Sequence, residues 1–197
     1  MQEKRKLFAV MDESFSDKSG VFFYVIAASI FQEPRNRVEK IFIEFLLGAK
    51  IFKTNRLNTR KRFGRIVSAL IWNRENLAIN ICSWEAGEVS SQESSRQYCL
   101  AKLLIELSNN EVFRCVMDSR ANPAVNDVTA ENRVDLRTLE FLKEELLINS
   151  KIELIHLTDH QCPLIGTADA VSWSARKFLI GDTPEYWNII SGNSILI

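Results

Sequence analysis

Glycine and cysteine are scarce in this chain of 197 residues, and each shortage excludes a class of site. The seven glycines form no Gly-rich phosphate loop, which disfavours nucleotide binding of the Rossmann or Walker kind. The four cysteines are widely spaced and include no Cys-x-x-Cys pair, so neither a zinc knuckle nor a redox motif is supported. We expect buried free thiols, as in a reducing cytoplasm.

A charge excess and a long apolar run are also missing. The 25 basic and 25 acidic residues cancel, so any attraction to nucleic acid must come from a local patch. No segment approaches the ~20 apolar residues of a membrane helix, and Asp12 interrupts the first apolar run, unlike a signal peptide. The composition is ordinary for a globular protein. We expect a single cytoplasmic domain over residues 1–197, without membrane contact.

What the chain does contain is a succession of β-rich apolar runs and segments with helical periodicity. Strands are predicted at 7–14, 21–30, 77–84, 112–118 and 151–157, and helices at 33–48, 65–72, 92–107, 134–148 and 163–178. The first two strands suggest a hairpin, with turn residues over 14–20. This order is typical of an α/β fold with a mixed sheet of about five strands flanked by helices.

Aspartates stand where several of these elements end or begin. The first strand carries Asp12 and Glu13 out of its end, the fourth ends in Asp118, Asp159 follows the fifth, and Asp169 lies on the last helix. In α/β sheets, sites form where strand ends meet. Two-metal phosphodiester hydrolysis needs several converging carboxylates, and oxygen ligands suit Mg²⁺ or Mn²⁺. The pattern therefore indicates a carboxylate cluster that holds divalent ions.

The expected roles differ among these acids. Asp12 would bridge two ions, Asp118 and Asp169 would each complete the shell of one, and Glu13 or Asp159 would be a further ligand or orient the attacking water. Three of these acids have a structural alternative. Asp159 suits a helix cap, Asp118 a turn, and Asp169 an exposed helix face.

A basic segment of the chain could bind the phosphates of a substrate at such a site. It lies in a helical insertion at about 50–74 and contains no acid between its first and last cation. Its cations are Lys53, Arg56, Arg60, Lys61, Arg62 and Arg65. They could neutralise the phosphates of RNA or DNA. The structural alternative is a solvated helix face.

The two histidines have different expected roles. His156 alternates into a strand, where an interior position satisfied by a hydrogen bond is expected. His160 lies on the loop near the proposed site, which favours an auxiliary role in proton transfer or phosphate contact.

Four short motifs resemble the bacterial and phage family called domain of unknown function 3800, which is considered to have a ribonuclease H-like fold. The motifs are Asp12-Glu13-Ser14, the segment 52–57, the strand ending in Asp118, and Thr167-Ala168-Asp169-Ala170. The resemblance spans nearly the whole chain. It implies a divalent-metal nuclease-like site at Asp12, Asp118 and Asp169, with Glu13 nearby and Lys53 as a phosphate contact.

The chain departs from that family at three positions. Ile51 and Gly166 stand where the family commonly has a glutamate and a glutamine, and Phe15 replaces a glycine of the turn. Three hypotheses follow: a metal-dependent nuclease; an inactive ribonuclease H-like module that binds nucleic acid or a protein partner; and a hydrolase of another phosphate ester. Assembly into a homo-oligomer is compatible with each.

Overall fold

A six-stranded mixed sheet organises the protein over the residues that the computed structural model describes, namely 7–17, 21–32, 38–40, 77–87, 92–119 and 130–197. Its strands are β1 (Leu7–Ser16), β2 (Phe22–Gln32), β3 (Leu77–Gly87), β4 (Val112–Asp118), β5 (Glu153–Leu157) and β6 (Ser194–Leu196). Their order across the sheet is β5-β4-β1-β2-β3-β6. β2 pairs antiparallel with β1 and β3, whereas β1 with β4, β4 with β5, and β3 with β6 are parallel.

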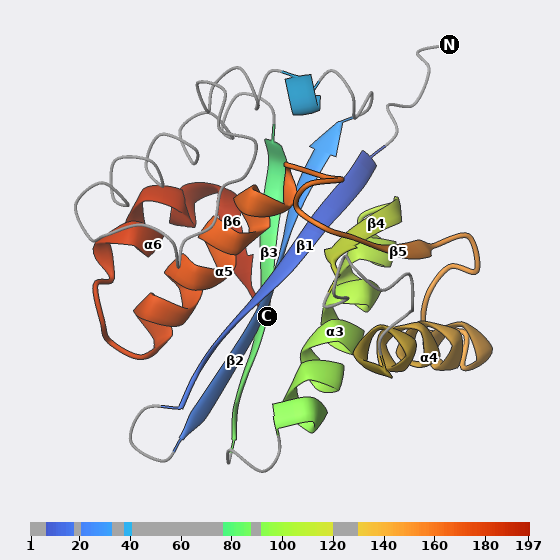
Figure 1. The fold of residues 1–197 in the computed structure, drawn as a ribbon, viewed down its shortest axis with the longest axis horizontal. Helices are drawn as coiled ribbons and strands as arrows, with labels where there is room; N and C mark the ends of the chain where they lie inside the picture. Colours follow the sequence, from blue (N-terminus) through green and yellow to red (C-terminus); the bar gives the residue numbers. More distant parts are fainter. Residues whose placement is uncertain (1–6, 18–20, 33–37, 41–76, 88–91, 120–129) are drawn as a thin grey trace.

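Helices cover both faces of this sheet (Figure 1). They are α3 (Gln92–Asn109), α4 (Ala130–Glu144), α5 (Ile165–Leu179) and α6 (Glu185–Ile190), followed by the 3-10 turn Ser191–Asn193. Figure 1 shows α3 and α4 on one side of the sheet and α5 and α6 on the other. The predicted α/β architecture with a mixed sheet is therefore confirmed.

Strand β1 is buried on both faces because it lies in the middle of the sheet. Successive side chains of a strand point to opposite faces. Phe8 and Val10 accordingly pack in one core with α5 and α6, while Ala9 and Met11 pack in the other with α3 and α4. Continuing this alternation assigns Asp12 to the α5 face and Glu13 to the α3 face.

Asp12 lies inside β1 and not at its end, which corrects the predicted boundary. β1 continues to Ser16, and each residue as far as Ser16 has a partner on β2. Phe15 extends the strand because its ring stacks on those of Phe22 and Tyr24, with centroids 5.7 and 6.4 Å apart. The prediction of a turn beginning at Ser14 was therefore wrong.

Helical periodicity predicts Tyr98 on the apolar face of the helix at 92–107 and Leu146 on that of the helix at 134–148, but neither position is buried. The buried stripe of α3 runs through Cys99, Leu103 and Leu107, and the side chain of Tyr98 is 50% exposed. Helix α4 ends at Glu144, so Leu146 lies beyond it and is 88% exposed. These positions fit the helical period but fall at the edge of the stripe or past the helix end.

No helix or strand is predicted after residue 178, but the structure forms α6 and β6 there. Helix α6 places the ring of Tyr186 edge-on against Trp173 of α5, with centroids 4.7 Å apart. Strand β6 then pairs with β3, Ser194 opposite Asn80, and adds a strand that was not predicted.

All four cysteines lie in the described ranges as buried thiols, as predicted. Burial raises the pKa of the Cys115 thiol to about 12, which makes the reactive thiolate rare at neutral pH. Helix 33–48 is represented in the described residues only by 38–40, which are helical, and the basic segment 50–74 lies outside them. None of the helices in the described ranges has the length and apolar character required to cross a membrane.

The α3 stripe gives a direct test of this packing. Leu103 is fully buried, so Leu103→Ala should lower the free energy of unfolding by about 2–5 kcal/mol through lost burial and a cavity. Leu146→Ala removes the same atoms from an exposed position and should change it by less than about 0.5 kcal/mol. Urea denaturation followed by circular dichroism measures both. Equal effects of the two substitutions would contradict the assignment of the buried face.

Candidate functional site

Asp12 and Asp118 occupy neighbouring positions on adjacent parallel strands. The register places Met11 of β1 beside Met117 of β4, so the next residue on each strand is an aspartate. Adjacent strands are about 4.8 Å apart. Val10 and Val116, two residues earlier on each strand, both pack in the core beneath α5, so strand alternation directs both aspartates to that face.

Asp169 belongs to the helix that covers this face. Only 8% of its surface is exposed, and Asp12 is similarly buried at 5%. Arg176, two turns further along α5, donates a hydrogen bond from Nε to Ser14 Oγ of β1 at 2.8 Å. Because seven residues are close to two full turns, Asp169 and Arg176 lie on the same side of α5.

Because α5 and β1 run in the same direction, Asp169 and Asp12 lie on the same side of the contact between Arg176 and Ser14. In Figure 1 both elements run toward the lower left, with α5 alongside β1. Asp169 precedes Arg176 by about 10 Å along the helix. Asp12 precedes Ser14 by about 7 Å along the strand. Starting from the contact between Ser14 and Arg176, the two carboxylates therefore lie in the same direction.

The buried position of Asp169 removes its structural alternative, because an exposed helix face does not describe it. Within the described ranges, however, no group of three or more His, Cys, Asp or Glu side chains is arranged so that it could hold a metal ion. Asp12 Oδ1 accepts a hydrogen bond from the backbone N–H of Glu13 at 2.7 Å. The structure thus brings three carboxylates to one face of the sheet without a complete ligand shell, and their oxygen donors suit a hard divalent ion.

Glu13 is not brought to this face. Its Oε2 accepts hydrogen bonds from the Tyr24 hydroxyl of β2 and from Arg96 Nε of α3, the latter at 2.9 Å. Both partners lie on the opposite side of the sheet from α5. Adjacency in sequence to Asp12 suggested a shared site, but strand alternation separates the two carboxylates.

Glu13 instead belongs to a buried polar network that was not predicted from the sequence. Arg96, 1% exposed, binds both carboxylate oxygens of Asp135 on α4, which is fully buried. His156 Nε2 of β5 lies 2.9 Å from Asp135 Oδ2, which confirms the expected interior position of this histidine. Helical spacing could have indicated that Arg96 is buried, since it precedes Leu100, Leu103 and Leu107 on the buried stripe of α3.

Mutual charge pairing keeps this network ionised. Burial lowers the pKa of Arg96, but the hydrogen bond to Asp135 and the negative charge of Glu13 raise it more, so the pKa is above its ordinary value. Burial likewise raises the pKa of Asp135, but hydrogen bonds with His156 and Arg96 bring it below its ordinary value. Both charges are therefore retained near neutral pH.

The turn between β5 and α5 contains the two auxiliary candidates. Asp159 lies in this turn, half-buried, and His160 is exposed. The residue that caps α5 is Leu164, which makes no side-chain capping hydrogen bond, so the expected cap role of Asp159 is wrong for this helix. The predicted phosphate contacts Lys53, Arg56, Arg60, Lys61 and Arg62 lie outside the described residues.

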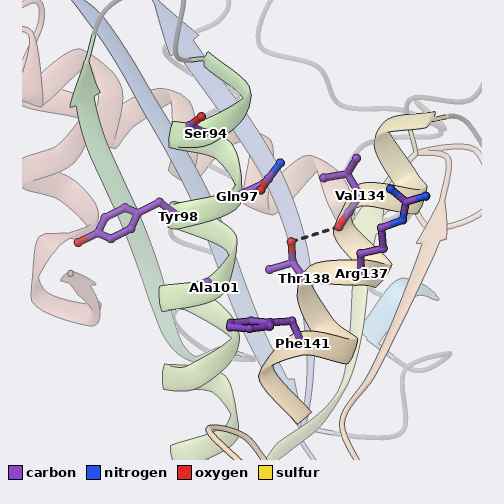
Figure 2. A pocket seen from close by; sticks show the side chains of 8 residues that line it. All are labelled: Ser94, Gln97, Tyr98, Ala101, Val134, Arg137, Thr138 and Phe141. Carbon is purple, nitrogen blue, oxygen red and sulfur yellow. Dashed lines mark hydrogen bonds between the residues drawn. The ribbon is translucent and has the colours of Figure 1, made fainter. Parts of the chain in front are cut away.

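A groove of about 570 Å³ lies between α3 and α4, on the side of the sheet away from Asp12 (Figure 2). Its lining residues are Ser94, Gln97, Tyr98, Ala101, Val134, Arg137, Thr138 and Phe141. Figure 2 shows Phe141 between the two helices, with Tyr98 and Arg137 pointing away from each other. No lining residue is a carboxylate, histidine or cysteine, so the groove offers no conventional metal ligand.

Comparison with known proteins adds no assignment. The chain matches no protein-family model, and no curated protein matches it. The resemblance to the domain of unknown function 3800 family therefore stays a prediction.

The buried network predicts a large loss of stability when one partner is removed. Arg96→Leu leaves Glu13 and Asp135 without their shared cation and should cost about 3–5 kcal/mol of unfolding free energy. Arg137→Leu, at an exposed position of α4, should change it by less than about 0.5 kcal/mol. Urea titration of both variants provides the measurement. Wild-type stability of Arg96→Leu would refute a structural role for the network.

The lowered pKa of Asp135 predicts an acid-dependent contribution to stability. Because the folded-state pKa lies below the ordinary value of 3.8, the stabilisation is fully present above about pH 4 and is lost as pH falls through the folded-state pKa. The difference in unfolding free energy between wild type and Asp135→Asn should therefore shrink below about pH 4. Chemical denaturation between pH 7 and pH 2 measures it. A difference that stays constant over this range would exclude the carboxylate as its source.

Proposed function

We propose that this protein is a ribonuclease H-like, divalent-metal-dependent nuclease that hydrolyses phosphodiester bonds of nucleic acid. The observation that carries the proposal is the placement of Asp12 and Asp118 at neighbouring positions of adjacent parallel strands, beneath the helix that bears Asp169. A mixed sheet with helices on both faces is compatible with the fold implied by the four motifs.

Asp12, Asp118 and Asp169 are the residues that would hold Mg²⁺ or Mn²⁺. A bound ion of this kind would lower the pKa of a water molecule and stabilise negative charge on the phosphate. Asp12 is the central member of the proposed site because its strand β1 contacts both β4, which bears Asp118, and α5, which bears Asp169. The burial of Asp12 and Asp169 strengthens their attraction for a cation, since the surrounding core has a low dielectric constant.

Two further groups of residues would assist at this face. Asp159 and His160, in the turn that leads from β5 into α5, are candidates for orienting water or contacting phosphate. The cations Lys53, Arg56, Arg60, Lys61 and Arg62 would neutralise the substrate backbone. Glu13 is assigned to the buried network with Arg96 and not to the ions.

The second candidate is a catalytically inactive module with the same fold that binds nucleic acid or a protein partner. It is favoured by the observation that no metal-holding group of three side chains occurs in the described ranges. Ile51 and Gly166, which replace polar residues of the family pattern, favour it as well. The two candidates differ in whether a divalent ion binds, which calorimetric titration with Mn²⁺ measures directly.

Cleavage assays test the preferred function. Labelled RNA and DNA are incubated with Mg²⁺ or Mn²⁺ and with wild type, Asp12→Asn, Asp118→Asn or Asp17→Asn. The first two substitutions remove proposed metal ligands and should reduce cleavage by at least about 100-fold. Asp17→Asn makes the same chemical change at an exposed position just past β1 and should leave cleavage unchanged.

Thermal melting curves of the four proteins verify that any loss is not caused by unfolding. Equal background cleavage by wild type and Asp12→Asn would rule out the nuclease assignment. Nucleic-acid binding without a divalent-ion site would favour the inactive module.

A further inference from the structure

Arg176 occupies a defined place beside the carboxylates. It projects from the same side of α5 as Asp169 and reaches Ser14, which follows Asp12 by two residues on the same face of β1. The hydrogen bond from Arg176 Nε to Ser14 Oγ, 2.8 Å long, fixes one edge of the guanidinium. The positive charge is thereby held about 7 Å along the strand from Asp12.

The rest of this guanidinium has no partner in the described part of the chain. The one hydrogen bond of Arg176 there is that from Nε to Ser14, which leaves both terminal nitrogens without an acceptor. Asp182 acts on Arg176 only through its charge, and its carboxylate is bound by Lys177 Nζ at 2.5 Å. Arg176 is thus a half-buried cation without a carboxylate of its own.

This arrangement carries a desolvation cost that an anion would relieve. Burial lowers the pKa of Arg176, and the charge of Asp182 offsets only part of that effect. Arg96, by contrast, is more deeply buried and has two carboxylate partners. A guanidinium with two free terminal nitrogens matches the oxygens of a phosphate group, to which it donates two parallel hydrogen bonds.

We propose that Arg176, oriented by Ser14, binds a backbone phosphate of nucleic acid next to the phosphate that lies at Asp12, Asp118 and Asp169. This assignment rests on the proposed function and identifies where the polymer crosses the sheet face. Arg176 is the phosphate-binding residue, and Ser14 is a positioning residue that acts through it. The substrate strand accordingly extends from Asp12 toward the end of β1.

Binding in the absence of metal tests this assignment independently of catalysis. Fluorescence anisotropy with labelled single-stranded RNA and DNA in EDTA compares wild type with Arg176→Gln, Arg176→Lys, Ser14→Ala and Arg137→Gln over a series of salt concentrations. Arg176→Gln should weaken binding about 10-fold and reduce the slope of log affinity against log salt by about 0.7. Arg137→Gln removes the same charge from an exposed position on the opposite side of the sheet and should have no effect.

The other two variants separate charge from geometry. Arg176→Lys keeps the charge, so it should retain the salt slope but not the full affinity, because an ammonium cannot make the paired contact. Ser14→Ala should likewise weaken binding at an unchanged slope. Arg176→Gln should melt at or above the wild-type temperature, since it removes a partly desolvated charge. A merely structural arginine would instead lower the melting temperature and leave affinity unchanged.

Each outcome decides between the proposals. If wild type and Arg176→Gln bind with equal affinity and slope, the role of Arg176 is refuted while the nuclease assignment is untouched. If binding depends on Arg176 but wild type cleaves nothing, the phosphate contact of Arg176 is supported and the nuclease assignment is refuted. If wild type binds no nucleic acid with or without Mn²⁺, both are overturned. Should Arg176→Gln not fold, the affinities of Arg176→Lys and Ser14→Ala decide the same question.

Discussion

Two adjacent carboxylates of one strand must point to opposite faces of the sheet, and this constraint divides the molecule into two polar regions. β1 pairs with β2 on one side and β4 on the other, so its backbone cannot rotate to bring Asp12 and Glu13 together. Asp12 faces α5 and the other candidate metal ligands. Glu13 faces α3 and meets Arg96. Strand alternation therefore separates Asp12, a proposed metal ligand, from Glu13, a member of the buried network.

The network on the α3 face joins elements that are distant in sequence. Arg96 links Glu13 of β1 to Asp135 of α4, and Asp135 reaches His156 of β5. Ion pairs this deeply buried contribute little net stability compared with an apolar core, because desolvation offsets their attraction. They do, however, penalise any packing that leaves one member unpaired. The network therefore fixes how α3 and α4 lie on the sheet.

The α5 face is organised differently, because its ionisable groups come from β1, β4 and the covering helix α5. Asp12 and Asp169 are buried, and Arg176 donates a hydrogen bond to the Ser14 hydroxyl. Such a concentration of ionisable groups at the junction of two strands and a helix is unfavourable for stability alone. Functional sites commonly bring ionisable groups together in buried positions of this kind. This grouping adds to the strand register of Asp12 and Asp118 as support for the site that we propose beneath α5.

Local pattern was enough to predict most elements of the fold. Apolar runs and helical periodicity indicated five strands and the helices α3, α4 and α5, because their buried faces repeat at the period of the backbone. Strand β6 has only three residues, Ser194–Leu196, and β3 stabilises it through pairing that local pattern does not encode. Likewise, the exposure of Tyr98 and Leu146 depends on which neighbours α3 and α4 meet.

Residue types along the chain were sufficient to nominate the groups of the proposed site: aspartates after apolar runs, and a lysine- and arginine-rich segment with no acid between its cations. Which of them share a face depended on folding. Strand register set Asp12 beside Asp118, helix packing buried Asp169 and brought Arg176 to Ser14, and alternation removed Glu13 to a different network. A residue's type is local, whereas the direction and neighbours of its side chain are set by elements far away along the chain.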